Sequence, residues 1–469
     1  MQCPGPGQCI VGSLRMQTPG TQSGPRLGLA RSWQFRETPY QRRRLPMAIG
    51  VVCALTRLPQ RRLRRGLASS CLPRRQVRQA WTLPPRAGDI AALELREETF
   101  DEPACGEVRV RVKAIGLNFA DVFTGLGLYG PVASGEVGGE AGGFVPGLEF
   151  SGVVEAKGSD TRRPLGIRAH GGQLCELSED VWALAEEAAS GFQVGDRVMG
   201  AMRFGAYATA VNVPAHQIRC IPDDWSFEEG AAFVVQPITV LYALRNLGVV
   251  KPGDTVLIHS AAGGCGLQAV AICLKLGVKV IGTVSSAAKV GVLLERFPEL
   301  RPEEVIIRGD NFKAQLQDAL EAVGSAGLNV VLDAVLGKVF QPGYDCLAPG
   351  GRYILYGAAS MTPQQDSLGP LGWIQLAWKW LRRPFVDVLE MPGRNKSLMG
   401  FNLIYCFEDA RALGSLLDDI LDFGLPRPCL GGIFPFEDAV EAIRTFRAGK
   451  TTGKIILKVS PGVIGHDVH

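Results

Sequence analysis

A glycine-rich turn, residues 260–266 with the sequence SAAGGCG, lies between an apolar run typical of a strand (255–260) and a helix-like run that ends at Gly277. A strand, a turn and a helix in this order direct backbone N–H groups and the positive end of the helix toward a pyrophosphate. Compared with G-x-G-x-x-G, the first glycine is replaced. The residues expected to hold the dinucleotide phosphates are Ala261, Ala262, Gly263, Gly264, Cys265 and Gly266. The alternative is a turn that only connects strand to helix.

The residues after the next predicted strand indicate which dinucleotide this turn would bind. An NAD site usually places Asp or Glu there to hold the ribose hydroxyls. Here the segment carries Ser285, Ser286 and Lys289 and no carboxylate, and Arg308 follows the third predicted strand. Two hydroxyls and two cations suit the additional phosphate of NADPH. The alternative is that Lys289 is simply a solvated lysine near the start of a helix.

The elements that must position these residues alternate between strand and helix after Pro252. Short apolar runs rich in β-branched residues, separated by stretches of helix length, are typical of a parallel sheet buried on both faces. We expect a doubly wound α/β domain. Its predicted strands are residues 255–260, 278–283, 304–307, 329–334 and 352–356.

The preceding part of the chain has a different character. The run VRVRVKA at 108–114 alternates apolar and charged residues, as a half-buried strand does. Further short strands separated by Gly and Pro predict a small antiparallel barrel. A segment without clear periodicity, residues 159–190, is predicted to be a surface insertion. The other predicted strands of this part are 152–156, 197–199 and 207–213, and a last one is 454–459.

Several motifs together resemble the quinone oxidoreductase and zeta-crystallin branch of the medium-chain dehydrogenase/reductase superfamily. They are GLNFAD at 116–121, VPGLEFSG at 145–152, GDRV at 195–198, the turn at 260–266 and Gly453-Lys454. The stretch KSLMGFNL at 396–403 is most similar to the vesicle amine transport protein subgroup. This resemblance implies a homodimer or tetramer and an α/β fold, with a GroES-like barrel and a Rossmann doubly wound parallel sheet. The domains expected are a GroES-like catalytic domain (79–233), a Rossmann domain (234–402), a return to the catalytic domain (403–460) and a tail (461–469).

The resemblance also implies a reaction without zinc. Zinc alcohol dehydrogenases use Cys, His and Cys as catalytic ligands, whereas the corresponding places here are Asn118, Leu148 and the 234–236 segment. We therefore expect no metal site. Hydride from NADPH would go to an acceptor that is already electrophilic, either a quinone or an α,β-unsaturated carbonyl. By resemblance, Asn118 and Asp121 would lie beside the nicotinamide and Tyr129 beside the acceptor, although Asn118 and Asp121 could instead only cap a helix.

A function of another class stays open. The stretch WIQLAWKWLRRPFVDVLEM at 373–391 holds three tryptophans and several cations. It could touch a membrane surface weakly, cover the substrate cleft or form a dimer contact. The competing hypothesis is accordingly a lipid-transfer or membrane-associated binding protein that keeps the dinucleotide fold as a scaffold.

The net charge of +4 hides an uneven distribution. Residues 1–78 hold fifteen Arg, no Lys and one acidic residue, which leaves 35 basic and 45 acidic residues in the rest of the 469-residue chain. An Arg-rich leader with almost no acids predicts a transit segment for a mitochondrion or plastid; without import the protein would be cytoplasmic. A basic arm for nucleic acid and initiation at Met47 are the alternatives, and we expect no nucleic-acid partner. Twelve cysteines without a C-x-x-C pair indicate reduced, mostly buried thiols.

Overall fold

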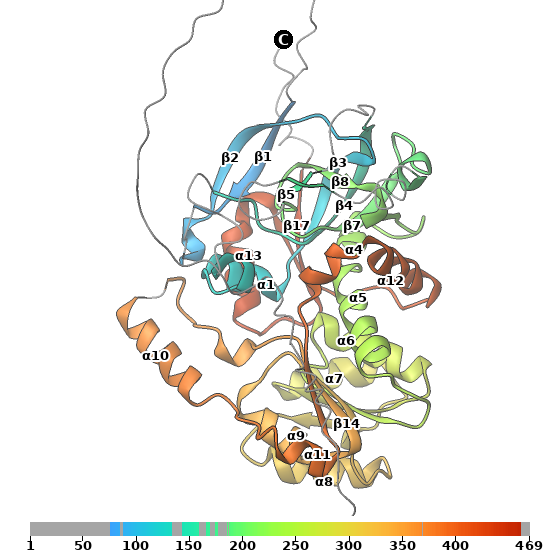
Figure 1. Ribbon diagram of the computed structural model, residues 1–469, viewed down its shortest axis with the longest axis vertical. Helices are drawn as coiled ribbons and strands as arrows, with labels where there is room; N and C mark the ends of the chain where they lie inside the picture. Colours follow the sequence, from blue (N-terminus) through green and yellow to red (C-terminus); the bar gives the residue numbers. More distant parts are fainter. Residues whose placement is uncertain are drawn as a thin grey trace, which may run out of the picture. The chain divides into compact units, whose positions relative to one another are not determined.

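The computed structural model describes residues 76–84, 88–133, 143–158, 166–168, 174–176, 185, 187–367 and 369–460. Residues 1–75 of the expected leader (1–78), most of the expected insertion (159–190) and the whole expected tail (461–469) lie outside these ranges. Two large sheets dominate the described part, one antiparallel for most of its extent and one wholly parallel (Figure 1). This is the mixed α/β fold that the sequence predicted.

The first sheet follows the order β16-β17-β3-β4-β7-β9, and β8 also pairs with β3. Its central strand β3 contains the alternating run, and Val108, Val110 and Val112 point into the core. Arg109, expected on a solvated face, is instead fully buried with its guanidinium 4.5 Å from the ring centre of Phe100. The strands are β3 (Glu107–Gly116), β4 (Glu149–Lys157), β7 (Arg197–Ala201), β8 (Ala210–Pro214), β9 (Ile218–Cys220), β16 (Leu430–Pro435) and β17 (Lys454–Lys458).

A separate hairpin of β1 (Gln76–Thr82) and β2 (Glu94–Phe100) precedes this sheet. The strand β1 includes the last three residues of the expected leader, 76–78. Arg78, counted with the leader, donates from Nε to Glu98 on β2 at 2.9 Å. This ion pair and the pairing of the two strands place the boundary slightly earlier than composition did.

The second sheet has six parallel strands in the order β12-β11-β10-β13-β14-β15. Val256 and Ile258 pack into the core on one face, whereas Leu257 packs into the core on the other. Burial on both faces is what the apolar runs predicted. The strands are β10 (Thr255–Ile258), β11 (Lys279–Val284), β12 (Val305–Ile307), β13 (Leu328–Asp333), β14 (Leu347–Leu355) and β15 (Ser397–Gly400).

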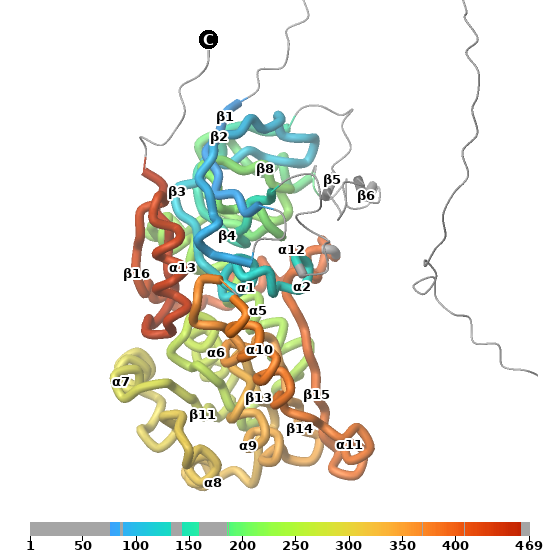
Figure 2. Tube along the Cα trace, turned by 90° about the vertical axis from the view of Figure 1, so that its left-hand side faces the viewer, coloured from blue at the N-terminus to red at the C-terminus, as the bar shows by residue number. Residues whose placement is uncertain are grey.

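The C-terminal part returns to the first sheet. The strand β17 pairs with both β16 and β3, and the helix α13 (Ala439–Arg447) lies beside them, as the red segments of Figure 2 show. The other α-helices are α1 (Phe119–Gly125), α2 (Gly130–Ala133), α4 (Phe227–Ala231), α5 (Val235–Leu241), α6 (Gly264–Lys275), α7 (Ala287–Arg296), α8 (Phe312–Ala322), α9 (Phe340–Asp345), α10 (Pro370–Leu381), α11 (Glu390–Arg394) and α12 (Ala410–Asp422).

The cysteine side chains that the structure describes are less buried than the sequence predicted. The seven cysteines whose side chains the structure describes are all free, but only Cys273 among them is buried, so the expectation of mostly buried thiols was wrong for these seven. Of the other six, Cys220 is exposed and five are half-buried. Within the described ranges, no helix combines the length and the apolar character that crossing a membrane requires.

Candidate functional site

The glycine-rich turn connects β10 to α6 and lines a cavity of about 530 Å³. The Ala261 N–H donates to the Thr283 carbonyl at 2.9 Å, which ties the turn to β11. At Gly266 an added Cβ would lie 2.2 Å from the Ser260 carbonyl oxygen, so the helix approaches the turn more closely than a side chain permits. Five of the six predicted residues, from Ala262 to Gly266, line the cavity, whereas Ala261 is buried behind it.

Two cations stand at one end of this cavity. The Lys289 ammonium donates to the Gly449 carbonyl at 2.8 Å, and the Arg308 guanidinium donates to the Thr283 hydroxyl at 3.1 Å. Burial lowers the pKa of both groups, and the positive charge of Arg308 lowers that of Lys289 further. A bound anion would offset this repulsion and desolvation. Ser285 also lines the cavity, while Ser286 is the exposed N-cap of α7.

Tyr129 lies at another part of the cavity wall. Its hydroxyl donates to the Asn402 side-chain oxygen at 2.8 Å. Burial is the main cause that raises the pKa of Tyr129 to about 12. The phenol is therefore protonated at neutral pH, and its single O–H is donated to Asn402.

Asn118, at the N-terminus of α1, lines the cavity and belongs to a buried polar cluster. Its amide nitrogen donates to Glu149 at 2.8 Å, and its amide oxygen accepts from the Lys454 ammonium at 2.8 Å. Lys454 and Glu149 form an ion pair with both side chains fully buried. The second Glu149 oxygen accepts from the Val235 N–H at 3.0 Å. These contacts fix the orientation of the Asn118 amide.

Asp121 lies behind the cavity wall rather than on it. Its carboxylate accepts from the Asn118 N–H at 2.8 Å and from the Tyr207 hydroxyl at 3.1 Å. Desolvation by burial is the largest cause that raises the pKa of Asp121 to about 7. The structure therefore gives Asp121 the contacts of a group that holds the start of α1, which was the alternative to a place beside the nicotinamide.

Several residues of the cavity were not predicted to take part in the site, some because they come from distant segments without a motif. Gln236 reaches the turn from α5: a Cβ added at Gly264 would lie 2.0 Å from its amide nitrogen. His259 also lines the cavity; its burial lowers its pKa to about 4 and leaves it neutral. The sequence signals were the 234–236 segment, considered only as the place of a zinc ligand, the KSLMGFNL stretch, which contains Asn402, and Gly453-Lys454. None of them indicated a contact with the turn or with Tyr129. Further lining residues that were not predicted include Tyr356, Phe401, Asn402, Arg447, Gly449 and Thr451.

The places compared with zinc ligands all line this cavity, through Asn118, Leu148 and Gln236. An amide, an alkyl group and a second amide are not the thiolates and imidazoles that hold catalytic zinc. Across the described residues, no group of three or more His, Cys, Asp or Glu side chains is arranged to hold a metal.

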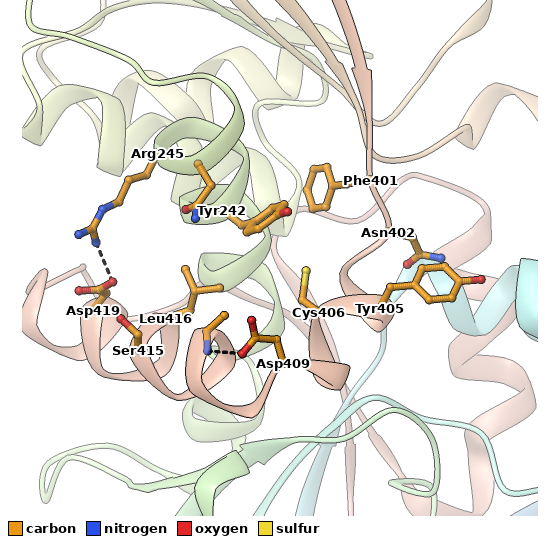
Figure 3. A pocket seen from close by; sticks show the side chains of 12 residues that line it. Tyr242, Arg245, Phe401, Asn402, Tyr405, Cys406, Asp409, Ser415, Leu416 and Asp419 are labelled. Carbon is orange, nitrogen blue, oxygen red and sulfur yellow. Dashed lines mark hydrogen bonds and ion pairs between the residues drawn. The ribbon is translucent and has the colours of Figure 1, made fainter. Parts of the chain in front are cut away.

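A second cavity, of about 590 Å³, shares Phe401 and Asn402 with the first (Figure 3). Tyr242 and Phe401 face one another there with ring centres 5.1 Å apart. An ion pair between Arg245 and Asp419, 2.6 Å long, joins the helices on the far side. The Phe401–Asn402 segment thus forms part of the walls of both cavities.

Comparison with known families identifies two domains. The model described as "Alcohol dehydrogenase GroES-like domain" matches residues 104–223, and the model described as "Zinc-binding dehydrogenase" matches residues 303–457. These ranges cover much of the first sheet and the second half of the parallel sheet together with β16 and β17.

Among curated proteins, the chain is 28% identical to the human synaptic vesicle membrane protein VAT-1 homolog over 379 residues, which is 80% of this chain and 84% of that protein. It is 30% identical to the Danio rerio protein of the same name, over 76% of this chain and 65% of that one. Among solved structures, a mycobacterial protein complexed with NADPH is similar with a TM-score of 0.63 and 27% identity, covering 81% of this chain and 99% of that one. A Pseudomonas syringae pv. tomato quinone oxidoreductase has a TM-score of 0.60 and 27% identity over the same shares.

Proposed function

Because the chain belongs to the medium-chain dehydrogenase/reductase superfamily, in the branch of the quinone oxidoreductases and VAT-1 homologues, we propose that it is an NADPH-dependent reductase of quinones or α,β-unsaturated carbonyls. The observation that carries this proposal is the single cavity that extends from the turn and the two cations to Tyr129. One cavity can therefore hold a phosphorylated dinucleotide and an acceptor together.

NADPH fits the residues present. Gly266 provides the close approach of backbone to backbone, and the helix N-terminus at Gly264 supplies N–H groups for the pyrophosphate. Lys289 and Arg308 provide two cations for the 2′-phosphate, and no carboxylate lines the cavity beside them. The related mycobacterial structure with NADPH supports this choice.

The bound NADPH supplies the hydride, and the chain supplies position and polarisation. When an acceptor binds, the Tyr129 hydroxyl exchanges its hydrogen bond to Asn402 for one to the acceptor oxygen on which negative charge develops. Asn118, held by Lys454 and Glu149, keeps one face of the cavity fixed. The proton that completes the reduction comes from water. We infer that no zinc takes part, since amide and alkyl side chains stand where zinc ligands would be needed.

The direct test is NADPH consumption by the purified chain with a panel of quinones and enones. We expect turnover with at least one class of acceptor. Tight NADPH binding without turnover of any acceptor would contradict the proposal. Addition of a chelator should leave the rate unchanged, and a loss of activity restored by zinc would refute the metal-free reaction.

The cofactor preference has its own test. Lys289→Ala and Arg308→Ala should each raise the Kd of NADPH by about tenfold to a hundredfold, because hydrogen bonds to charged groups contribute about 1.5–3 kcal/mol. The Kd of NADH should change little. Lys313→Ala, an exposed lysine on α8, is the matched control. Equal weakening of both dinucleotides would argue against a 2′-phosphate contact.

Import into an organelle is a separate proposal, supported by the fifteen arginines of residues 1–78. A fusion of this segment to a fluorescent protein should be imported and should lose import when the arginines are replaced by Gln. A fusion that stays cytoplasmic would contradict it.

A further inference from the structure

The helix α10 exposes more large apolar side chains than a soluble surface usually carries. Its three tryptophans, Trp373, Trp378 and Trp380, are each 55–56% exposed. The chain that follows continues this pattern, with Phe385 86% and Leu389 85% exposed. Apolar surface gathered in one segment marks a site of interaction. We call Pro370–Leu381 together with residues 382–389 the apolar helix segment.

The direction of the apolar face follows from the contacts of the helix. Gly372 is buried, and Lys379, two turns later on the same stripe, donates to the Ser360 carbonyl at 2.9 Å. This stripe faces the body of the protein. The residues spaced for the opposite side of the helix are apolar and exposed. They are Leu371, Ile374, Trp378 and Leu381, flanked by Trp373 and Trp380. Figure 1 shows α10, in orange, at the left-hand margin of the drawn helices and strands.

The charged side chains near the tryptophans are all positive. No acidic residue occurs from Gly369 to Val386, and three cations do. The Arg382 guanidinium lies 4.3 Å from the Trp378 ring centre, and that of Arg383 lies 3.7 Å from the Trp380 ring centre. Arginines beside exposed indoles combine an apolar surface with a positive rim.

We propose that the apolar helix segment docks onto the surface of an anionic lipid membrane. Twelve helical residues reach about 18 Å, too short to cross a bilayer, so the helix would lie flat with its indoles at the level of the head groups. Arg382 and Arg383 would face anionic lipid phosphates. A contact between two copies through this face fits less well, because it would bring two sets of cations within about one Debye length of each other. The docking is independent of the proposed reductase activity.

The test is sedimentation of the full chain with phosphatidylcholine vesicles, either pure or with about one third phosphatidylserine. We expect binding to the anionic vesicles and much less to the neutral ones. Replacing Trp373, Trp378 and Trp380 together by Ser should weaken binding about a hundredfold, from the loss of buried apolar area. Replacing Arg382 and Arg383 by Gln should weaken it about thirtyfold and reduce its salt dependence.

The matched control is Val194→Ser with Ile433→Ser, two exposed apolar residues outside the apolar helix segment. It should bind as the unmodified chain does. The basic leader is present in every variant, so its own attraction to anionic lipid cancels in the comparison. Unchanged thermal unfolding of each variant excludes misfolding as a cause.

Two outcomes would overturn the proposal. In one, the tryptophan variant binds vesicles as tightly as the control does. In the other, sedimentation equilibrium finds a dimer that the tryptophan variant converts to a monomer while vesicle binding stays the same, which would assign this face to a second copy of the chain.

Discussion

At the scale of single residues, one side chain on the cavity wall can be tested directly for a part in the reaction. Several others act only through the residues that they contact. Tyr129 has a hydroxyl on the wall, and its raised pKa keeps it a donor. Tyr129→Phe should lower kcat about a hundredfold with little change in NADPH affinity, as loss of one donor to a developing oxyanion does. Steady-state kinetics and a binding titration measure the two effects. Tyr405→Phe, which does not line this cavity, is the control; equal kcat losses in both variants would remove the special role of Tyr129.

The raised pKa of Asp121 predicts how the free energy of unfolding depends on pH. Its pKa is about 7 when folded and near 3.8 when exposed, so the folded chain binds more protons between these values. An acid with a raised folded pKa lowers stability as pH rises from about 4 to about 7 and adds no further change above that. Relative to Asp121→Asn, the wild-type chain should therefore lose on the order of 4 kcal/mol of unfolding free energy over this range. Urea unfolding at several pH values measures it, and a difference that is constant with pH would contradict it.

The sequence predicted which residues near a motif would come together, but it did not predict whether a side chain would lie on the cavity wall or behind it. The turn, Lys289 and Arg308 follow directly after strands of a parallel sheet, whose carboxyl ends meet at one edge, and the structure brings them to one cavity. From the GLNFAD motif, Asp121 was expected beside the nicotinamide. In the structure it lies in the first turn of α1, behind the cavity wall. Asn402 and Lys454 could not be assigned contacts, because their partners Tyr129 and Glu149 are hundreds of residues away.

At the scale of elements, the strand–turn–helix unit of β10 and α6 depends on Gly266. A methyl group there would meet the Ser260 carbonyl, which belongs to the backbone and cannot rotate away. Gly266→Ala should cost about 1–3 kcal/mol of stability and weaken NADPH binding at least tenfold. Gly291→Ala on α7 is the matched control, since a methyl group there meets nothing within 4 Å, and it should be neutral or slightly stabilising. Chemical denaturation and a dinucleotide titration distinguish the two variants; identical behaviour would refute the steric argument.

The elements themselves were predictable where apolar periodicity is strong. Each expected strand of the parallel sheet has a counterpart in β10 to β14, with ends displaced by a few residues. The edge strand β15 was missed because SLMG is short and half exposed, and the β1–β2 hairpin was missed because β2 is mostly charged. Edge and surface strands are held by pairing with a neighbour, which a local pattern does not reveal.

At the scale of the whole molecule, the Lys454–Glu149 pair connects segments that are 305 residues apart and supports the cavity through Asn118. Lys454→Met should cost about 3–5 kcal/mol, because it leaves a buried carboxylate without its cation. Glu149→Gln in the same chain should recover much of that loss. A double-mutant cycle in urea measures the coupling. Simple addition of the two losses would show that the pair is not a coupled unit.

The place of β17 in the first sheet has a consequence for how the protein is made. Glu149 and the strand β3 leave the ribosome hundreds of residues before Lys454 and β17, which pair with them. The parallel sheet between them consists of local strand–helix units and can form during synthesis. The barrel must meanwhile keep an open strand edge and a carboxylate without its cation. Chaperones that act on the nascent chain would therefore find their site on the first sheet, and its exposure would end when Lys454 arrives.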